Sequence, residues 1–292
     1  MELIQQLING ISLGSIYALI ALGYTMVYGI IKLINFAHGD VFMVGAFTGF
    51  YLITVFHLPF VLALVLTMLI TALLGVVIER VAYKPLRNAT RIAALITAIG
   101  VSLLIEYTTI YLRGAQPAAY PDDIIPNKTI AISGLTISSQ SIVILAVSVT
   151  LMIILELFIH KTKTGKAMRA VSVDADAARL MGINVDRTIS VTFAIGSALA
   201  GAAGVAFGIY YIKIEPLMGI IPGLKAFIAA VLGGIGIIPG AMVGGMLLGI
   251  VEALVSAAGF SLWRDAAAFL ILILILLFKP SGLFGKNIRE KV

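Results

Sequence analysis

HKTKTGKAMRAVSVDADAARLMGINVDR, the sequence of His160–Arg187, is a polar segment long enough to hold a folded element between the apolar runs that flank it. Six of its residues are Lys or Arg. Asp176 precedes two alanines and Gly182 closes the run, so the pattern predicts a short helix with an acid near its N-terminus and a glycine at its end. The apolar residues of that helix recur at helical spacing: Ala177, Leu180 and Met181. A surface helix of this kind is either a solvated connector or a plug for a soluble partner.

The composition indicates a membrane protein. Hydrophobic residues make up 61% of the 292 residues and charged residues 12%, whereas soluble domains carry about 25% charged residues. Apolar runs of about 20 residues recur from end to end, which is the length that an α-helix needs to cross a bilayer. Met1–Gln6 lacks the basic region of a cleavable signal peptide, so we expect the first run to be retained. We predict an all-α polytopic membrane protein in which residues 1–292 form a single domain.

About nine spans are predicted, within a range of eight to ten. Their approximate bounds are 7–31, 41–58, 60–78, 92–112, 140–159, 189–212, 220–238, 240–260 and 266–278. A faint internal repeat joins Leu73–Glu79 to Leu247–Glu252. Each lies one span after an apolar segment broken by Gly or Pro, the first break at Asn35–Asp40 and the second at Pro216–Lys225. With the fifth span as a linker, spans 1–4 and 6–9 would have opposite orientations, which is the inverted-repeat plan of many transporters.

The basic residues of the loops predict the orientation. One side collects Lys32, Arg80, Lys84, Arg87, Arg91, the six of His160–Arg187, Lys279, Lys286, Arg289 and Lys291. The other side receives only Arg113, Lys128, Lys213 and Arg264. The basic side is expected to be cytoplasmic, which places the N-terminus outside and the C-terminus inside the cell. Residues 160–188 then form a cytoplasmic loop, and residues 113–139 form the largest external loop, either a surface lid or part of a docking face.

Polar residues interrupt the apolar runs at two places. Asn35, His38 and Asp40 lie at the first break, where Asp40 either caps the helix that begins at Val41 or belongs to a broken helix that faces a passing solute. Lys225 lies near the second break, where it either reaches the outer membrane surface or lines a pathway. Glu252, inside a later span, should face other helices or water rather than lipid.

Several chemistries have no support in the sequence. Thr164–Ala167 lacks the upstream glycine and the hydroxyl residue after Lys166 that a phosphate-binding loop requires. Three scattered histidines and no cysteine give no metal-ligand cluster, and no Ser or carboxylate pair has the context of a hydrolase motif. The net charge of +6 is explained by topology, so no nucleic-acid partner is expected. We expect no catalytic residue and no cofactor in this chain.

Several blocks, in the same order along nearly the whole chain, resemble the permease subunit of the ABC importers for branched-chain amino acids, the Liv-type high-affinity system. The blocks are Asn35–Gly39, Thr164–Ala170, Ala177–Ile183, Gly223–Phe227 with Leu232–Gly236, and Lys279–Gly285. Asp176-Ala177-Ala178 with Gly182 also resembles the Glu-Ala-Ala-x-x-x-Gly loop of ABC permeases, with Asp in place of Glu.

This resemblance implies a complex. It would contain a homologous second permease subunit, two cytoplasmic ABC ATPase subunits that bind the ATP, and an external solute-binding protein. The helix near Asp176 would then be a plug in a groove of the ATPase, with coupling residues Asp176, Ala177, Ala178, Gly182 and Ile183. The expected pathway residues are Asn35, His38, Asp40, Lys225 and Glu252, and the expected solutes are leucine, isoleucine and valine.

Three alternatives stay open at the level of sequence. A paralogous importer for urea, amides or other amino acids would share the same blocks. A channel or ion-driven carrier would use His38, Asp40, Glu106 and Glu252 as a proton relay, but would leave the cytoplasmic helix unexplained. An intramembrane enzyme is disfavoured because no catalytic pair is placed.

Overall fold

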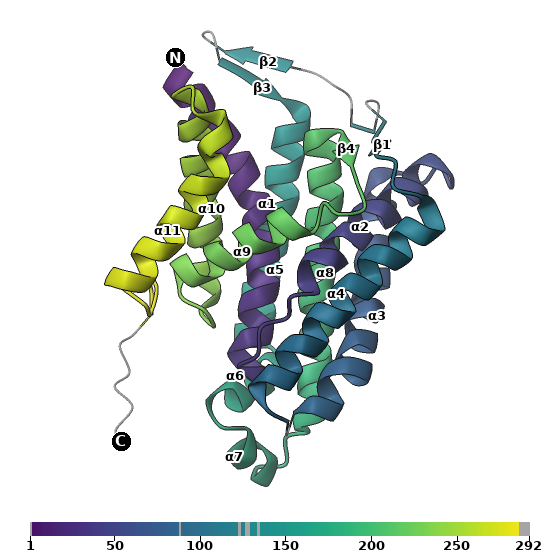
Figure 1. The fold of residues 1–292 in the computed structure, drawn as a ribbon, viewed down its shortest axis with the longest axis vertical. Coiled ribbons are helices and arrows are strands. Elements are labelled where there is room, and N and C mark those ends of the chain that lie inside the picture. The colour runs from purple at the N-terminus through teal and green to yellow at the C-terminus, as the bar shows by residue number, and fades with distance from the viewer. Residues whose placement is uncertain (1, 88, 122–123, 126–128, 133–134, 286–292) are drawn as a thin grey trace.

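The computed structural model describes residues 2–87, 89–121, 124–125, 129–132 and 135–285 (Figure 1). Most of the described chain is helical, as the composition predicts. Seven of the described helical segments are long and apolar enough to cross a membrane. They contain α1 (Glu2–Ile31), α3 (Phe60–Ile78), α4 (Arg91–Arg113), α5 (Ser139–Lys161), α8 (Val185–Tyr211), α10 (Ile238–Ala257) and α11 (Arg264–Phe278), the last continuing the 3-10 turn Ser261–Trp263.

The predicted count of nine spans is not confirmed. Predicted spans 41–58 and 220–238 coincide with two shorter helices, α2 (His38–Thr54, 17 residues) and α9 (Ile220–Gly233, 14 residues). At 1.5 Å per residue α9 is about 21 Å long, which is less than the roughly 30 Å hydrocarbon core of a bilayer. The apolar run 220–238 predicted a full span, because hydrophobicity alone does not indicate where a helix ends within an apolar run.

Polar residues in the connections begin several helices. The side chain of Thr90 accepts a hydrogen bond from the Ala93 amide at the start of α4, and Ser138 does the same for Ser141 at the start of α5. Asn184 accepts one from the Arg187 amide, 2.9 Å away, at the start of α8. Such caps satisfy amides that have no partner within the helix, so these short polar runs fix where the apolar helices begin.

Four short strands correct the expectation of a purely α-helical chain. β1 (Ala118–Ala119) pairs antiparallel with β4 (Lys213–Ile214), with Ala118 opposite Ile214. β2 (Thr129–Ile132) pairs antiparallel with β3 (Leu135–Ser138), with Thr129 opposite Ser138. Three of the four lie in the predicted external loop 113–139, where the backbone is not helical and its N–H and C=O groups can pair between strands. The strands therefore join this loop to the segment that follows α8.

Tyr120 anchors the same loop to the helices. Its side chain is buried, and its hydroxyl donates a 2.6 Å hydrogen bond to the carbonyl oxygen of Ala46 in α2. Burial raises the pKa of the Tyr120 phenol well above its ordinary value, so the hydroxyl keeps its proton and remains a donor.

The centre of the molecule is formed by α1 and α8. In their most apolar windows, 83% and 72% of the residues are buried, against 6% in α11. Small residues allow close approach along α1, since a Cβ atom added to Gly14 would lie 2.7 Å from the Cα atom of Met246 in α10. A similar close contact joins α3 to α8, where a Cβ atom added to Gly75 of α3 would meet the side chain of Ser197 of α8. In a bilayer such close packing replaces the hydrophobic drive between helices.

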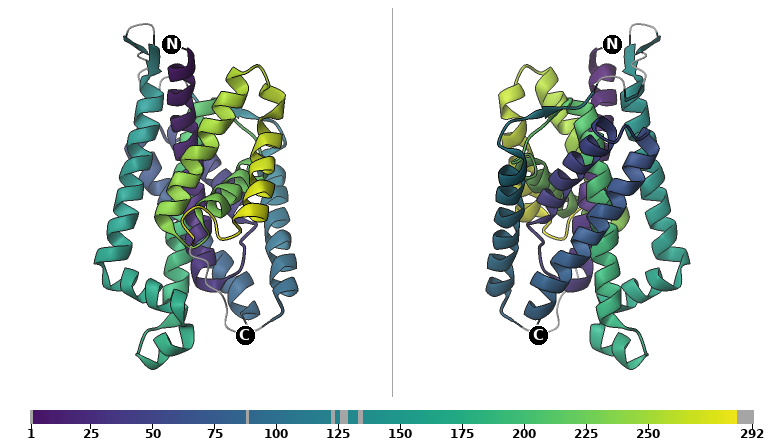
Figure 2. Two further views of the ribbon diagram at one scale, coloured as in Figure 1. Left: turned by 90° about the vertical axis from the view of Figure 1, so that its left-hand side faces the viewer. Right: turned by 90° about the vertical axis from the view of Figure 1, so that its right-hand side faces the viewer.

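The two short helices meet near the middle of the bundle. A Cβ atom added to Gly39 in α2 would lie 3.3 Å from the Cα atom of Gly223 in α9. The side views show α1 and the β2–β3 hairpin reaching one end of the molecule and the helices α6 (Lys163–Val173) and α7 (Ala175–Leu180) forming the opposite end (Figure 2).

Candidate functional site

A buried ion-pair cluster joins three helices near the second break. The Lys225 ammonium nitrogen of α9 lies 2.9 Å from Oε1 of Glu252 in α10 and 2.6 Å from Oδ1 of Asp265 in α11. Lys225 is 5% exposed and Glu252 is 1% exposed. Tyr17 of α1 donates a 3.1 Å hydrogen bond to Oε2 of Glu252. Lys225 is therefore held inside the protein by two carboxylates, and the alternative in which it reaches the membrane surface is wrong.

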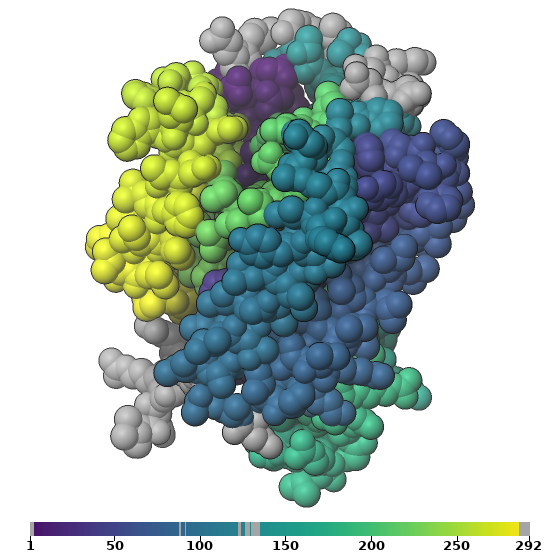
Figure 3. Space-filling view, turned by 45° about the vertical axis from the view of Figure 1, so that its right-hand side comes forward, coloured from purple at the N-terminus to yellow at the C-terminus, as the bar shows by residue number. Residues whose placement is uncertain are grey.

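A cavity of about 390 Å³ opens beside this cluster. Its lining comes from α1, α8, α9, α11 and the 213–218 segment, and includes Lys225, Arg264 and Asp265 together with apolar residues such as Phe207 and Ile221. In the space-filling view, α9 and the segment before it (green) are visible between α11 (yellow) and α4 (blue) (Figure 3). Charged groups of both signs and apolar side chains line the same cavity.

The first break places its polar residues inside the bundle. α2 begins at His38, with Ala37 at the N-cap position and no side-chain cap. Asp40 therefore lies in the first turn and does not cap a helix that begins at Val41, as one alternative expected. Asn35 accepts a 3.0 Å hydrogen bond from the Tyr83 hydroxyl, and the His38 ring packs edge-on against Tyr24 with 4.7 Å between centroids.

Asp40 faces α4. Its carboxylate accepts a hydrogen bond from the Ser102 hydroxyl, and Glu106, one turn further along α4, interacts with the same carboxyl group. Asp40 is 2% exposed and Glu106 is 5% exposed. Because buried carboxyl groups are costly in a membrane, their placement against one another rather than toward lipid agrees with the sequence-based expectation for intramembrane acids.

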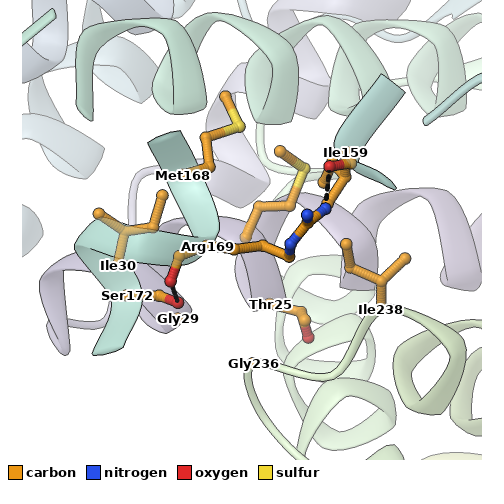
Figure 4. A pocket seen from close by; sticks show the side chains of 10 residues that line it. Thr25, Gly29, Ile30, Ile159, Met168, Arg169, Ser172, Gly236 and Ile238 are labelled. Atoms are coloured by element: carbon orange, nitrogen blue, oxygen red, sulfur yellow. Dashed lines mark hydrogen bonds between the residues drawn. The ribbon is translucent and has the colours of Figure 1, made fainter. Parts of the chain in front are cut away.

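The polar segment His160–Arg187 forms two helices, where the sequence analysis expected one. The N-cap of α6 is Thr162, whose hydroxyl accepts a 3.0 Å hydrogen bond from the Gly165 amide. Arg169 reaches across a small cavity and donates to the carbonyl oxygen of Ile159, and the Ser172 hydroxyl donates to the carbonyl oxygen of Arg169 at 2.8 Å (Figure 4). The Arg169–Ile159 hydrogen bond fixes α6 to the end of α5.

α7 is the predicted short helix. Its N-cap is Asp174, whose Oδ1 accepts from the amides of Asp176 and Ala177 at 2.9 Å each, with Asp176 in the first turn. Gly182 follows the helix with a φ of 81°, a left-handed conformation that suits glycine, as predicted.

The two sides of this α7–Gly182 segment differ in burial. Ala178 is buried and Ile183 is half-buried, whereas Leu180 and Met181 are 89% and 83% exposed. Two large apolar side chains are therefore exposed next to each other at the tip of a polar segment.

A second buried ion-pair cluster lies above this tip. Glu79, in the π-helical turn Glu79–Tyr83 that continues α3, is fully buried and pairs with Arg87. Arg87 also pairs with Asp186, in the first turn of α8, and the Ser190 hydroxyl donates to Glu79 at 2.6 Å. The end of α3 is thereby tied to the part of α8 that directly follows α7.

The described residues of the chain contain no group of three or more His, Cys, Asp or Glu side chains that could hold a metal ion. Both clusters instead pair a buried acid with a base, Glu252 with Lys225 and Glu79 with Arg87. An unpaired charge inside a membrane helix bundle is costly, and these pairs remove that cost.

Comparisons with known proteins decide the family. Residues 6–278 match the family described as branched-chain amino acid transport system / permease component. The chain is 43% identical over 301 residues to the high-affinity branched-chain amino acid transport system permease protein BraD of Pseudomonas aeruginosa, covering 99% of this chain and 98% of that protein. It is 44% identical over 300 residues to the high-affinity branched-chain amino acid transport system permease protein LivH of Escherichia coli K12, covering 99% of this chain and 97% of that protein. This chain belongs to the branched-chain amino acid permease family.

Among solved structures, PsaBC from Streptococcus pneumoniae in complex with a Fab matches this permease with a TM-score of 0.47 and 12% identity, covering 97% of this chain and 92% of that one. The full-length sequence relatives, not this distant structure, establish the family.

In this permease the predicted residues fall into three separate groups. Lys225 and Glu252 are in direct contact, Asn35, His38 and Asp40 surround the start of α2, and Asp176–Ile183 lies at the tip. Five further residues of the two ion-pair clusters and the cavity were not predicted from the sequence: Tyr17, Glu79, Arg87, Arg264 and Asp265. Arg87 and Arg264 were counted only as loop charges, because a positive residue at the end of a span is usually explained by topology. The apolar context of Glu79, in the repeat Leu73–Glu79, was the signal that could have identified it.

Proposed function

We propose that this chain is the permease subunit of an ATP-driven importer for leucine, isoleucine and valine, and that it forms half of the translocation pathway. The single observation that carries this proposal is the 43–44% identity, over nearly the whole length, to BraD and LivH, whose names state that solute class. The chain is a transport subunit and not an enzyme, and the ATP would be bound by partner subunits.

The proposed complex contains a homologous second permease, two cytoplasmic ATPases and an external solute-binding protein. The tip of the polar segment supports the ATPase contact, since Leu180 and Met181 expose large apolar side chains beside the acid Asp176. Of the predicted coupling residues, Asp176 and Ala177 would face the ATPase and Gly182 would shape the turn. Ala178 and Ile183, which point inward, would carry the movement to the end of α8.

The proposed orientation has the N-terminus outside and the C-terminus in the cytoplasm of an inner membrane. The described ends agree with it: the α6–α7 end carries the basic residues of 160–188 and adjoins Lys84 and Arg87, while the opposite end carries the 113–139 loop. Lys128, Lys286, Arg289 and Lys291, which also entered the charge count, lie outside the described residues. Loop 113–139 would be the external contact for the binding protein.

The inverted repeat is proposed to relate α1–α4 to α8–α11, with α5 as the linker. Its support is the matched packing of α1 against α10 and of α3 against α8, and the meeting of the short helices α2 and α9. Two pairs of residues are separated by the same number of positions in the sequence. One pair is Gly23 and Gly196, which touch where α1 and α8 cross. The other is Glu79 and Glu252, each of which is the buried acid of one ion-pair cluster. Counting α2 and α9, the chain would pass the bilayer region nine times within one domain.

The pathway is proposed to run beside the breaks that precede α2 and α9, along Asn35, His38, Asp40, Lys225 and Glu252. Burial of these polar groups in an apolar bundle supports a functional use, because each is costly to keep in a membrane. The alternative of an ATP-independent carrier draws on the buried Asp40–Glu106 contact, and predicts uptake that continues without the ATPase.

The experiment that tests the proposal is uptake by the reconstituted complex with labelled leucine, competed by unlabelled isoleucine, valine, urea and acetamide. The two branched-chain amino acids should compete fully, and urea and acetamide should not compete. Competition by urea alone would identify the paralogous importer instead. Gly182→Trp should lower co-purification of the ATPase without lowering membrane insertion, because a large side chain at a φ of 81° distorts the tip.

A further inference from the structure

The 390 Å³ cavity is lined by Lys225, Asp265 and Arg264. The single ammonium of Lys225 is shared by two carboxylates, those of Glu252 and Asp265. Tyr17 donates a hydrogen bond to Glu252, which is the arrangement that suits an ionised carboxylate. With these groups at their ordinary charges, Lys225, Glu252 and Asp265 together carry one excess negative charge.

Arg264 supplies the opposite charge. It lines the same cavity, and within the part of the chain that the structure describes it has no carboxylate partner within 4 Å. Its neighbour is the phenol of Tyr211, which is polar and uncharged. Lys213, the remaining base of the lining, is already paired with Glu215 at 3.2 Å on the exposed rim. Arg264 is thus a guanidinium that is available for an anionic group inside the cavity.

We propose that this cavity binds the zwitterionic head group of an amino acid, with Arg264 binding the carboxylate and Asp265 the ammonium. The inference rests on the proposed function and adds the residues that select the solute. A guanidinium binds a carboxylate through two parallel hydrogen bonds, and a carboxylate that already holds Lys225 still has acceptor sites for a second ammonium. The Asp265 side chain is 55% exposed, so a ligand in the cavity can reach it.

The remaining walls suit an apolar side chain. Phe207, Leu217, Met218 and Ile221 complete the lining, and the volume exceeds by about tenfold the roughly 30 Å³ of one water molecule. Urea and simple amides carry no separated charges and would leave the Arg264 guanidinium unpaired. The cavity therefore favours a zwitterion with an apolar side chain over a small neutral amide.

A purely structural role would explain the burial of Lys225 but not the position of Arg264. Lys225 ties α9 to α10 and α11, and that tie alone would explain its burial. Arg264 contacts only the uncharged Tyr211 phenol of α8 among the described residues, so its replacement tests ligand binding while the Lys225 ion pairs stay in place.

The test uses the complete complex, purified in detergent without the solute-binding protein, and saturation-transfer NMR of three probes at equal concentration. The probes are leucine, isoamylamine, which lacks the carboxylate, and isocaproate, which lacks the ammonium. We expect leucine to bind, and each analogue to bind about tenfold more weakly or worse, since each loses a charge-assisted contact. Arg264→Gln should abolish the preference of leucine over isoamylamine, and Arg264→Lys should restore it in part.

Lys213→Gln is the matched control. It removes a positive charge from the rim where the ion pair is exposed, and should change leucine binding by no more than about twofold. Leucine binding by Arg264→Gln at the wild-type level would overturn the inference, as would equal binding of leucine and isoamylamine, or no leucine binding, by the wild-type complex. If Arg264→Gln fails to assemble, the comparison of the three probes on the wild type decides alone.

Uptake separates this inference from the proposed function. The wild-type complex with leucine-loaded binding protein should accumulate leucine in proteoliposomes. If the wild type accumulates leucine and the Arg264→Gln variant accumulates it equally well, the cavity is not the amino-acid site, but the proposed importer function stands. Absence of leucine accumulation by the wild type would reject the importer itself.

Discussion

The hydroxyl of Ser190 donates a 2.6 Å hydrogen bond to the fully buried carboxylate of Glu79. Ser190 lies in α8 shortly after the α7 tip, and Glu79 lies where α3 ends, so the bond joins the segment next to the tip to a membrane helix. Arg87 neutralises the same carboxylate and also pairs with Asp186. A displacement of α7 by a partner would therefore reach α3 through side chains that are already in contact.

The Glu79–Arg87 pair should behave as a coupled unit. Arg87→Met would leave the Glu79 carboxylate buried without its cation, which costs about 3 kcal/mol or more. Adding Glu79→Gln removes that charge, so the double variant should be more stable than Arg87→Met alone. Thermal unfolding of the three purified variants measures this. Losses that simply add would show that the two groups do not interact.

Glycine at the α1–α10 contact should be indispensable for packing. Gly249→Ala would place a Cβ atom against the backbone of Gly14, where neither helix can yield without separating. Gly100→Ala, on α4, is the matched control because nothing lies within 4 Å of its added Cβ. The first variant should lower the yield of folded protein severalfold, and the second should be neutral. Equal yields for the two would refute close packing at this contact.

The apolar tip should hold the ATPase. Leu180→Asp places a charge where the side chain is 89% exposed, so the permease should fold normally. If this surface is buried by the partner, the substitution should lower co-purification of the ATPase about tenfold or more, because an unpaired charge at an interface costs several kcal/mol. Leu262→Asp, 97% exposed at the other end of the molecule, should retain the ATPase fully. An intact complex with Leu180→Asp would remove the tip from the interface.

His38 should matter for transport more than for stability. His38→Phe keeps a planar ring against Tyr24 and removes both imidazole nitrogens. A swap of similar volume in a packed core costs less than about 1.5 kcal/mol, so the melting temperature should change little. Uptake of leucine by the reconstituted complex should fall, since His38 stands beside the proposed pathway. Unchanged uptake would take His38 off that pathway.

The sequence predicted those features that follow from hydrophobicity and charge counted along the chain. The short helix before Gly182 and the membrane helices outside the breaks are such features, because apolar length and helix-ending residues are local signals. The lengths of α2 and α9 were not predicted, since the choice between a full span and a short helix depends on how Gly39 and Gly223 pack against each other.

Pairing between distant residues explains the rest of the difference. Lys225 and Glu252 were both selected as costly intramembrane charges, but nothing local indicated that they touch each other, or that Asp265 completes the cluster. Asp40 looked like a helix cap because Val41 begins an apolar run, whereas its actual partner, Ser102, lies on α4. Contacts of this kind depend on the three-dimensional arrangement of the helices, so they cannot be predicted from local patterns in a single sequence.

The central claim is that this chain conducts the solute while separate ATPase subunits supply the work. The most direct measurement compares proteoliposomes that contain the purified chain alone with proteoliposomes that contain the complete complex, both with leucine-loaded binding protein outside and ATP inside. We predict accumulation of leucine against its gradient, with ATP hydrolysis, only in the complete complex. Accumulation by the chain alone would contradict the account.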